Sequence, residues 1–154
     1  MSYSIIGLLL ILSIIVFQDC QKRLVSVWAL LLLGVIALYQ FFLCQNTYIH
    51  LLGNSLFVLF QFAVLFIFIS AKLKQATNIF QNYIGIGDFF FFLAIAPLFS
   101  FKNFILLHTI SLILVALLWL IIKPLFKKES IPLAGLYACI LIPYTLYLWK
   151  TSFC

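Results

Sequence analysis

Apolar residues fill six long stretches of the chain, and short polar connections separate these stretches. A helix needs about 20 mostly apolar residues to cross roughly 30 Å of hydrocarbon, and each stretch approaches that length. We therefore predict an all-α, polytopic membrane protein with about six transmembrane helices. The predicted spans cover residues 2–18, 24–43, 51–71, 84–101, 104–122 and 131–149.

The composition agrees with a chain that lies almost entirely in a lipid bilayer. Of its 154 residues, 67% are hydrophobic and 8% are charged, and the mean hydropathy is +1.29. Six helices and their connections use the whole length, so we expect one transmembrane domain over residues 1–154. The net charge of +6 would suggest a nucleic-acid partner in a soluble protein. Here it indicates topology, and no nucleic-acid partner is expected.

The positive charges are distributed unevenly between the connections. Seven of the nine Lys and Arg residues follow the first, third and fifth predicted spans. Positive residues are retained on the cytoplasmic side, so these three connections are expected inside and both termini outside. We predict a multi-pass protein of the inner (plasma) membrane. The seven residues are Lys22, Arg23, Lys72, Lys74, Lys123, Lys127 and Lys128.

Two of the three acidic residues fall at predicted membrane boundaries. Asp19 ends the first span and Asp88 begins the fourth, so the predicted topology brings both to the cytoplasmic face. A carboxylate at membrane depth costs several kcal/mol unless it is paired, hydrated or protonated. Two neighbouring carboxyl groups can share one proton. The ionised group can then take a proton from water while the neutral group polarises a peptide carbonyl. Asp19 and Asp88 are therefore candidate catalytic residues.

Three further residues are candidate supports for this pair. Gly85 and Gly87 precede Asp88 and would let another backbone approach the carboxylate closely. The alternative for this segment is a glycine-rich helix start with Asp88 as N-cap. Arg23 lies four residues after Asp19, so a helix would place both on one face. Its alternative is an interfacial ion pair that contributes little.

The histidines and cysteines do not indicate a metal or a cofactor. His108 lies within a span and His50 in an outer connection, and neither has a carboxylate or cysteine at ligand spacing. Both are interpreted as packing or interface residues. The four cysteines form no C-x-x-C pair. Cys44 and Cys154 fall on the predicted outer side and can pair, although sequence spacing does not determine their proximity.

With these motifs the chain resembles the type IV prepilin peptidase family of GxGD membrane aspartyl proteases. The resemblance implies that Asp19 and Asp88 are a catalytic pair. It also implies a pilin-like precursor as substrate, whose basic leader is cut at the cytoplasmic membrane face. Only the peptidase part is present, without the domain associated with N-methylation. The matching segments are Asp19-x-x-x-Arg23-x-Val25, Gly85-Ile86-Gly87-Asp88 and Ile131-Pro132-Leu133-Ala134-Gly135.

The chain also departs from the family at two positions. Phe90 stands where members often have Lys, and Ser26 stands where a proline is typical. Two other interpretations therefore stay open. One is a non-proteolytic membrane protein, such as a small proton-coupled carrier that uses Asp19 and Asp88 as a relay. The other is an inactive assembly subunit with the same fold. The sequence determines neither the cleavage motif nor the oligomeric state.

Overall fold

The computed structural model describes residues 2–22, 25–44, 47–73, 85–122 and 133–150. Helices make up nearly all of these residues, and none of them forms a strand. The all-α fold predicted from the apolar pattern is confirmed, and each predicted span overlaps one long helix except the fourth, which contains a shorter helix followed by a 3-10 turn. The elements are α1 (Ser2–Lys22), α2 (Val27–Leu43), α3 (Tyr48–Leu73), α5 (Ile86–Ile95), the 3-10 turn η1 (Ala96–Leu98), α6 (Phe101–Ile122) and α7 (Leu133–Lys150).

Three of the helices are long and apolar enough to cross a membrane. These stretches are Tyr3–Gln21 in α1, Tyr48–Phe68 in α3 and Phe101–Ile121 in α6. The other apolar helices are shorter, and the α5 segment with η1 covers only Ile86–Leu98. By length and composition the chain therefore has the character of a membrane protein, with long helices and short ones in the same bundle.

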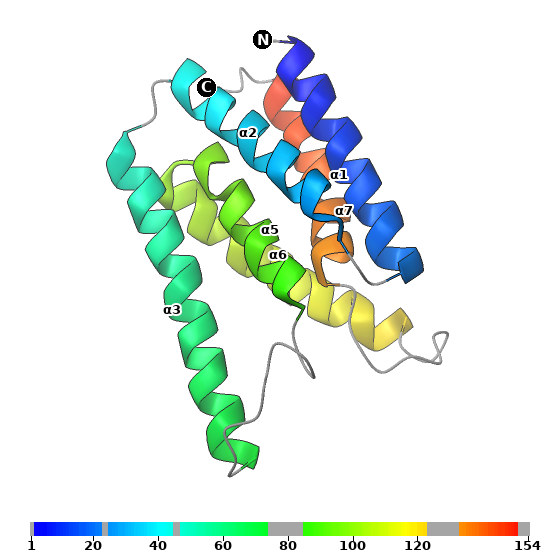
Figure 1. Ribbon diagram of the computed structural model, residues 1–154, viewed down its shortest axis with the longest axis vertical. Helices are drawn as coiled ribbons and strands as arrows, with labels where there is room; N and C mark the ends of the chain where they lie inside the picture. The colour runs from blue at the N-terminus through cyan, green and yellow to red at the C-terminus, as the bar shows by residue number, and fades with distance from the viewer. Residues whose placement is uncertain (1, 23–24, 45–46, 74–84, 123–132, 151–154) are drawn as a thin grey trace.

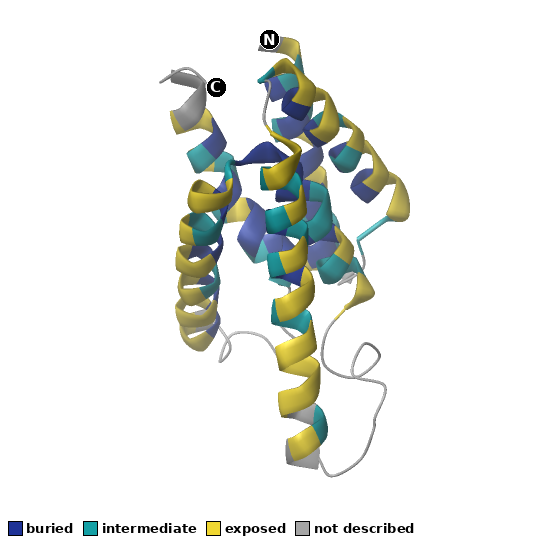
Figure 2. Ribbon diagram, turned by 90° about the vertical axis from the view of Figure 1, so that its left-hand side faces the viewer, coloured by how far each residue is buried: buried dark blue, intermediate teal, exposed yellow. Residues whose placement is uncertain are grey.

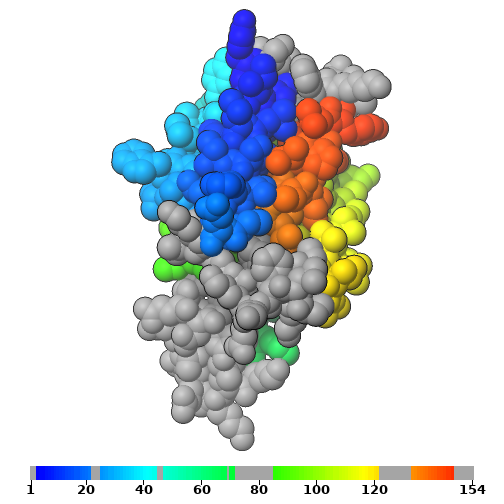
Figure 3. Space-filling model, turned by 90° about the vertical axis from the view of Figure 1, so that its right-hand side faces the viewer, coloured from blue at the N-terminus to red at the C-terminus, as the bar shows by residue number. Residues whose placement is uncertain are grey.

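The helices form a bundle in which α1 and α7 are the most closely associated pair (Figure 1). The two helices run side by side along one face of the molecule (Figure 3). Helix α2 packs against α1 and α5, and α6 packs against α3 and α7. The first turn of α7 therefore meets the last turn of α1, close to where α5 begins. This corner of the bundle contains both candidate aspartates.

The fourth predicted span, residues 84–101, is interrupted close to Pro97. Helix α5 ends at Ile95, and η1 contains Pro97 near its start. Proline lacks an N–H and cannot continue the hydrogen bonding of the preceding turn. The buried Asn54 of α3 satisfies two carbonyl groups at this break, because its Nδ2 donates to Ala96 O and Phe99 O at 2.8 Å each. Asn54 thus fixes the chain reversal between α5 and α6.

Burial is unequal along the bundle (Figure 2). Aromatic rings from α5, α6 and α7 fill its centre, and Phe91, Phe92, Phe104 and Tyr137 are all almost fully buried. The second half of α3 extends away from this core, and its residues 63–68 are exposed. In a bilayer such an apolar surface faces lipid.

Candidate functional site

Asp88 lies in the first turn of α5 and contacts the start of α7. Gly85 is the N-cap of α5, so Asp88 occupies the third helical position and the alternative of Asp88 as N-cap is wrong. The Asp88 Oδ1 atom accepts a hydrogen bond from the backbone N–H of Ala134 at 2.9 Å. The carboxylate also interacts with the backbone of Gly85, as an acid at this helical position does in a capping box.

Asp19 reaches the same helix end from α1. It lies in the last turn of α1 and is only 4% exposed. Its Oδ2 atom accepts a hydrogen bond from the backbone N–H of Gly135 at 2.6 Å. Ala134 and Gly135 are consecutive, so the two aspartates converge on neighbouring amides and are close enough to interact electrostatically. The structure brings together the two residues that the sequence singled out.

The start of α7 explains why two acids gather there. The first amides of a helix have no carbonyl partner within that helix. A Ser, Thr, Asp or Asn before the helix normally accepts from them. Leu133 is preceded in the sequence by Pro132, which has no side-chain oxygen. Asp88 and Asp19 accept from the amides of Ala134 and Gly135 in this turn, and the partial positive charge at the helix N-terminus favours their negative charge.

Gly135 is a functional residue to which the sequence analysis gave no role. A Cβ atom at this position would lie 3.0 Å from both Cβ and Oδ2 of Asp19, closer than side chains normally pack. Only glycine lets α7 approach α1 closely enough for its amide to reach the carboxylate. The sequence signal was the pair of small residues Ala134 and Gly135, two residues after Pro132, a residue type that suits a first helical turn.

The two glycines before Asp88 have different surroundings. A Cβ atom on Gly85 would lie 3.2 Å from Oδ2 of Asp88, so a side chain there would crowd the carboxylate. A Cβ atom on Gly87 would lie 3.6 Å from the Cβ of Val25, which is an ordinary contact distance. Gly85 therefore provides the closer approach. Arg23, the third predicted support, lies outside the described residues.

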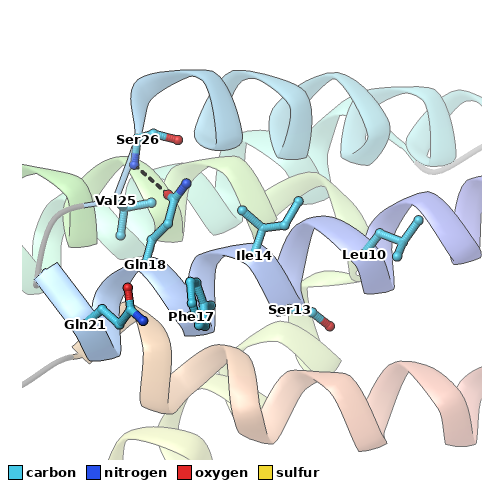
Figure 4. Close-up of a pocket in the computed structure, with 8 residues that line it drawn as sticks. All are labelled: Leu10, Ser13, Ile14, Phe17, Gln18, Gln21, Val25 and Ser26. Carbon is cyan, nitrogen blue, oxygen red and sulfur yellow. Dashed lines mark hydrogen bonds between the residues drawn. The ribbon is translucent and has the colours of Figure 1, made fainter.

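A groove runs along the outer face of α1 toward the residues that precede α2 (Figure 4). Its volume is about 630 Å³. At its end the Gln18 Oε1 atom accepts from the Ser26 N–H at 3.0 Å, and Ser26 caps α2 through Ala29. Proline at position 26 could not make the first of these bonds, which gives this departure from the family pattern a local structural role. The lining residues are Leu10, Ser13, Ile14, Phe17, Gln18, Gln21, Val25 and Ser26.

The cysteines are in two different states. Cys44, at the end of α2, is disulfide-bonded. Its candidate partner Cys154 lies outside the described residues. Cys20 on α1 and Cys139 on α7 are free and exposed. Among the described residues no three His, Cys, Asp or Glu side chains cluster in a way that could hold a metal ion.

Comparisons with known proteins identify no relative of the chain. No protein-family model matches the chain, and neither the curated proteins nor the solved structures contain a significant match.

Proposed function

We propose that the chain is a membrane aspartyl endopeptidase that cleaves the basic leader of pilin-like precursors at the cytoplasmic membrane face. The observation that carries this proposal is the convergence of Asp19 and Asp88 on the consecutive amides of Ala134 and Gly135. The two acids come from different helices, Asp19 from α1 and Asp88 from α5. Their resemblance to the catalytic pair of GxGD peptidases supplies the reaction class.

The reaction needs only the two carboxyl groups and water. The ionised carboxylate accepts a proton from the water, whose oxygen attacks the carbonyl carbon of the scissile peptide. The neutral carboxyl group donates its proton to the carbonyl oxygen, which gives a tetrahedral diol. The C–N bond then breaks: the carboxyl group that took the water proton gives it to the nitrogen, and the other carboxylate takes a proton from a diol hydroxyl, which becomes the new carbonyl and restores the pair to its starting state. The amides of α7 hold both carboxylates in place through this cycle.

The state of Cys44 supports the proposed orientation. Disulfides form and persist on the oxidising, non-cytoplasmic side of a membrane. Cys44 lies one helical turn after Gln40. The Gln40 Oε1 atom accepts a hydrogen bond from Ser4 Oγ at 2.9 Å, so Cys44 is at the same end of the bundle as the start of α1. Asp19 is at the other end of α1, about 22 Å from Ser4 at 1.5 Å per residue. If the Cys44 end is outside, the aspartates face the cytoplasm, where a basic leader is available.

A second candidate function is an inactive assembly subunit in which the aspartates only cap α7. The hydrogen bonds to Ala134 and Gly135 favour it, because they alone would stabilise the helix. Capping an exposed helix contributes about 1 kcal/mol, and Asn caps about as well as Asp. Asparagine, however, cannot exchange a proton at neutral pH. A change of Asp to Asn therefore separates the two functions.

The experiment is co-expression of the chain with a tagged pilin-like precursor that carries a basic leader. The wild type is expected to convert the precursor to a shorter mature form. Asp19→Asn and Asp88→Asn are each expected to leave it uncut while inserting at normal levels. Substantial cleavage by a well-expressed Asp88→Asn protein would exclude the aspartyl mechanism and favour the capping role.

A further inference from the structure

A second polar cluster lies inside the bundle, among aromatic rings. His108 of α6 is 1% exposed and stacks on Phe104, with ring centroids 5.3 Å apart. Its Nε2 atom lies 2.7 Å from Gln61 Oε1 on α3, and its Nδ1 atom lies 3.1 Å from the Tyr137 hydroxyl on α7. One imidazole ring thus connects three helices. A buried polar side chain at membrane depth is a candidate for a functional role.

The direction of these hydrogen bonds follows from the groups involved. Gln61 Oε1 can only accept, so the N–H of His108 is on Nε2 and donates to it. The Nδ1 atom then accepts from the Tyr137 hydroxyl. A neutral His108 therefore satisfies both ring nitrogens at once. The cluster needs no charge and no water, so it is suited to hold helices rather than to move protons.

The cluster is joined to the aspartate site through two of the three helices that form the site, α7 and α5. Tyr137 is in the first turns of α7, two residues after the Gly135 amide that reaches Asp19. Phe92 of α5, one turn after Asp88, packs against His108 and Tyr137 with centroid distances of 4.8 and 5.0 Å. The orientation of α7 relative to α5 therefore depends on contacts with His108.

We propose that His108 is a positioning residue for the aspartate pair. By accepting from Tyr137 it fixes the rotation of α7 that directs the Ala134 and Gly135 amides at Asp88 and Asp19. The hydrogen bond to Gln61 of α3 holds the imidazole ring in place, but it does not itself determine the orientation of α7. The changes in kcat that this proposal predicts rest on the proposed peptidase function.

Two substitutions at His108 separate these bonds. In His108→Asn the amide oxygen takes the place of Nδ1 and can still accept from Tyr137, while the bond to Gln61 is lost. In His108→Gln the amide nitrogen takes the place of Nε2 and can still donate to Gln61, while the bond to Tyr137 is lost. Both variants lose one hydrogen bond and the ring packing. A purely structural role would therefore affect them equally.

We expect His108→Asn to keep kcat within about threefold of the wild type, and His108→Gln to lower it about tenfold with KM unchanged. Tyr137→Phe should match His108→Gln, and their double variant should be no worse, because both remove the same bond. Ser4→Ala is the control: it removes an interhelical bond between α1 and α2 at the far end of α1 and should leave kcat unchanged. Equal losses in the two His108 variants would overturn the proposal.

A second readout does not depend on activity. Cys20 on α1 and Cys139 on α7 are free, exposed and close enough to interact electrostatically. A short bis-maleimide should link them in the wild type and in His108→Asn, and several-fold more slowly in His108→Gln, as measured by mass spectrometry of the linked peptides. If the wild type cleaves no precursor, the proposed function fails and the linking rates alone decide. Equal linking in both variants would then refute the positioning role.

Discussion

Helices α1 and α3 are both long and apolar enough to cross a membrane, yet α1 is buried against the bundle to a much greater extent than α3. In the spanning stretch of α1, 33% of the residues are buried, compared with 11% in that of α3. Helix α1 packs along α7 and α2, whereas α3 touches the bundle mainly through its first half (Figure 2). Apolar character alone therefore does not determine which helix lies in the core.

What differs is the chemistry of the contacts. Helix α1 approaches α7 closely because Gly135 has no side chain, and Asp19 then bonds to the exposed amide. Helix α3 is fixed by Asn54, which bonds to carbonyls at the α5 break, and by Gln61, which bonds to His108. Small residues and polar side chains are the means by which helices associate when lipid and protein are equally apolar. A few small and polar residues therefore determine how these helices pack.

The largest expected effect is at the α1–α7 contact. Gly135→Ala would place a Cβ atom 3.0 Å from Asp19, so the helices must separate. A displacement of about 1 Å can lower turnover about a hundredfold. The matched control is Gly34→Ala on α2, whose Cβ would lie 4.0 Å from the Ala94 Cβ. In a cleavage assay Gly135→Ala should be nearly inactive and Gly34→Ala fully active. Equal activity would contradict the close-approach argument.

The packing of α3 against the rest of the bundle should depend strongly on Asn54. Asn54→Leu keeps a similar volume but leaves the Ala96 and Phe99 carbonyls without their partner. Buried acceptors without a hydrogen bond cost about 1–3 kcal/mol, so the free energy of unfolding in detergent should fall by that amount. Leu56→Ala, at a position that is 63% exposed, is the control and should change it by less than about 0.5 kcal/mol. A stable Asn54→Leu protein would show that α3 is held by other contacts.

The smallest effect concerns the two glycines of the Asp88 segment. In Gly85→Ala the new Cβ would lie 3.2 Å from Oδ2 of Asp88 and must displace the carboxylate slightly. In Gly87→Ala the new Cβ meets Val25 at an ordinary distance. We expect turnover to fall several-fold in the first variant and by less than twofold in the second. The reverse order would mean that Gly87, and not Gly85, provides the close approach to the carboxylate.

The sequence was sufficient to predict the helices and to single out the two aspartates that the structure brings together. Uninterrupted apolar stretches determine where helices form, and a carboxylate in such a stretch needs a partner whatever the fold. The break near Pro97 also has a local cause, because proline removes a donor. These conclusions depend on local chemistry that can be read within a few residues.

The partner of the aspartates could not be predicted, because it is a pair of backbone amides. Every residue except proline has a backbone N–H. The identities of Ala134 and Gly135 therefore do not show that their amides are the ones that bond to the aspartates. The His108 cluster was missed for another reason. Gln61, His108 and Tyr137 are each isolated polar residues in apolar stretches, and each was interpreted separately. A requirement that buried polar groups pair would have linked them.

The central claim is that Asp19 and Asp88 act as one catalytic unit and not merely as caps of α7. The most direct test is to measure cleavage of a purified precursor by the wild type, Asp19→Asn, Asp88→Asn and the double variant, with the thermal stability of each. Asparagine still accepts from the α7 amides, so stability should stay within about 1 kcal/mol of the wild type. All three variants should be inactive, and the double variant no worse than either single one. Retained cleavage in either single variant, with its fold intact, would contradict the account.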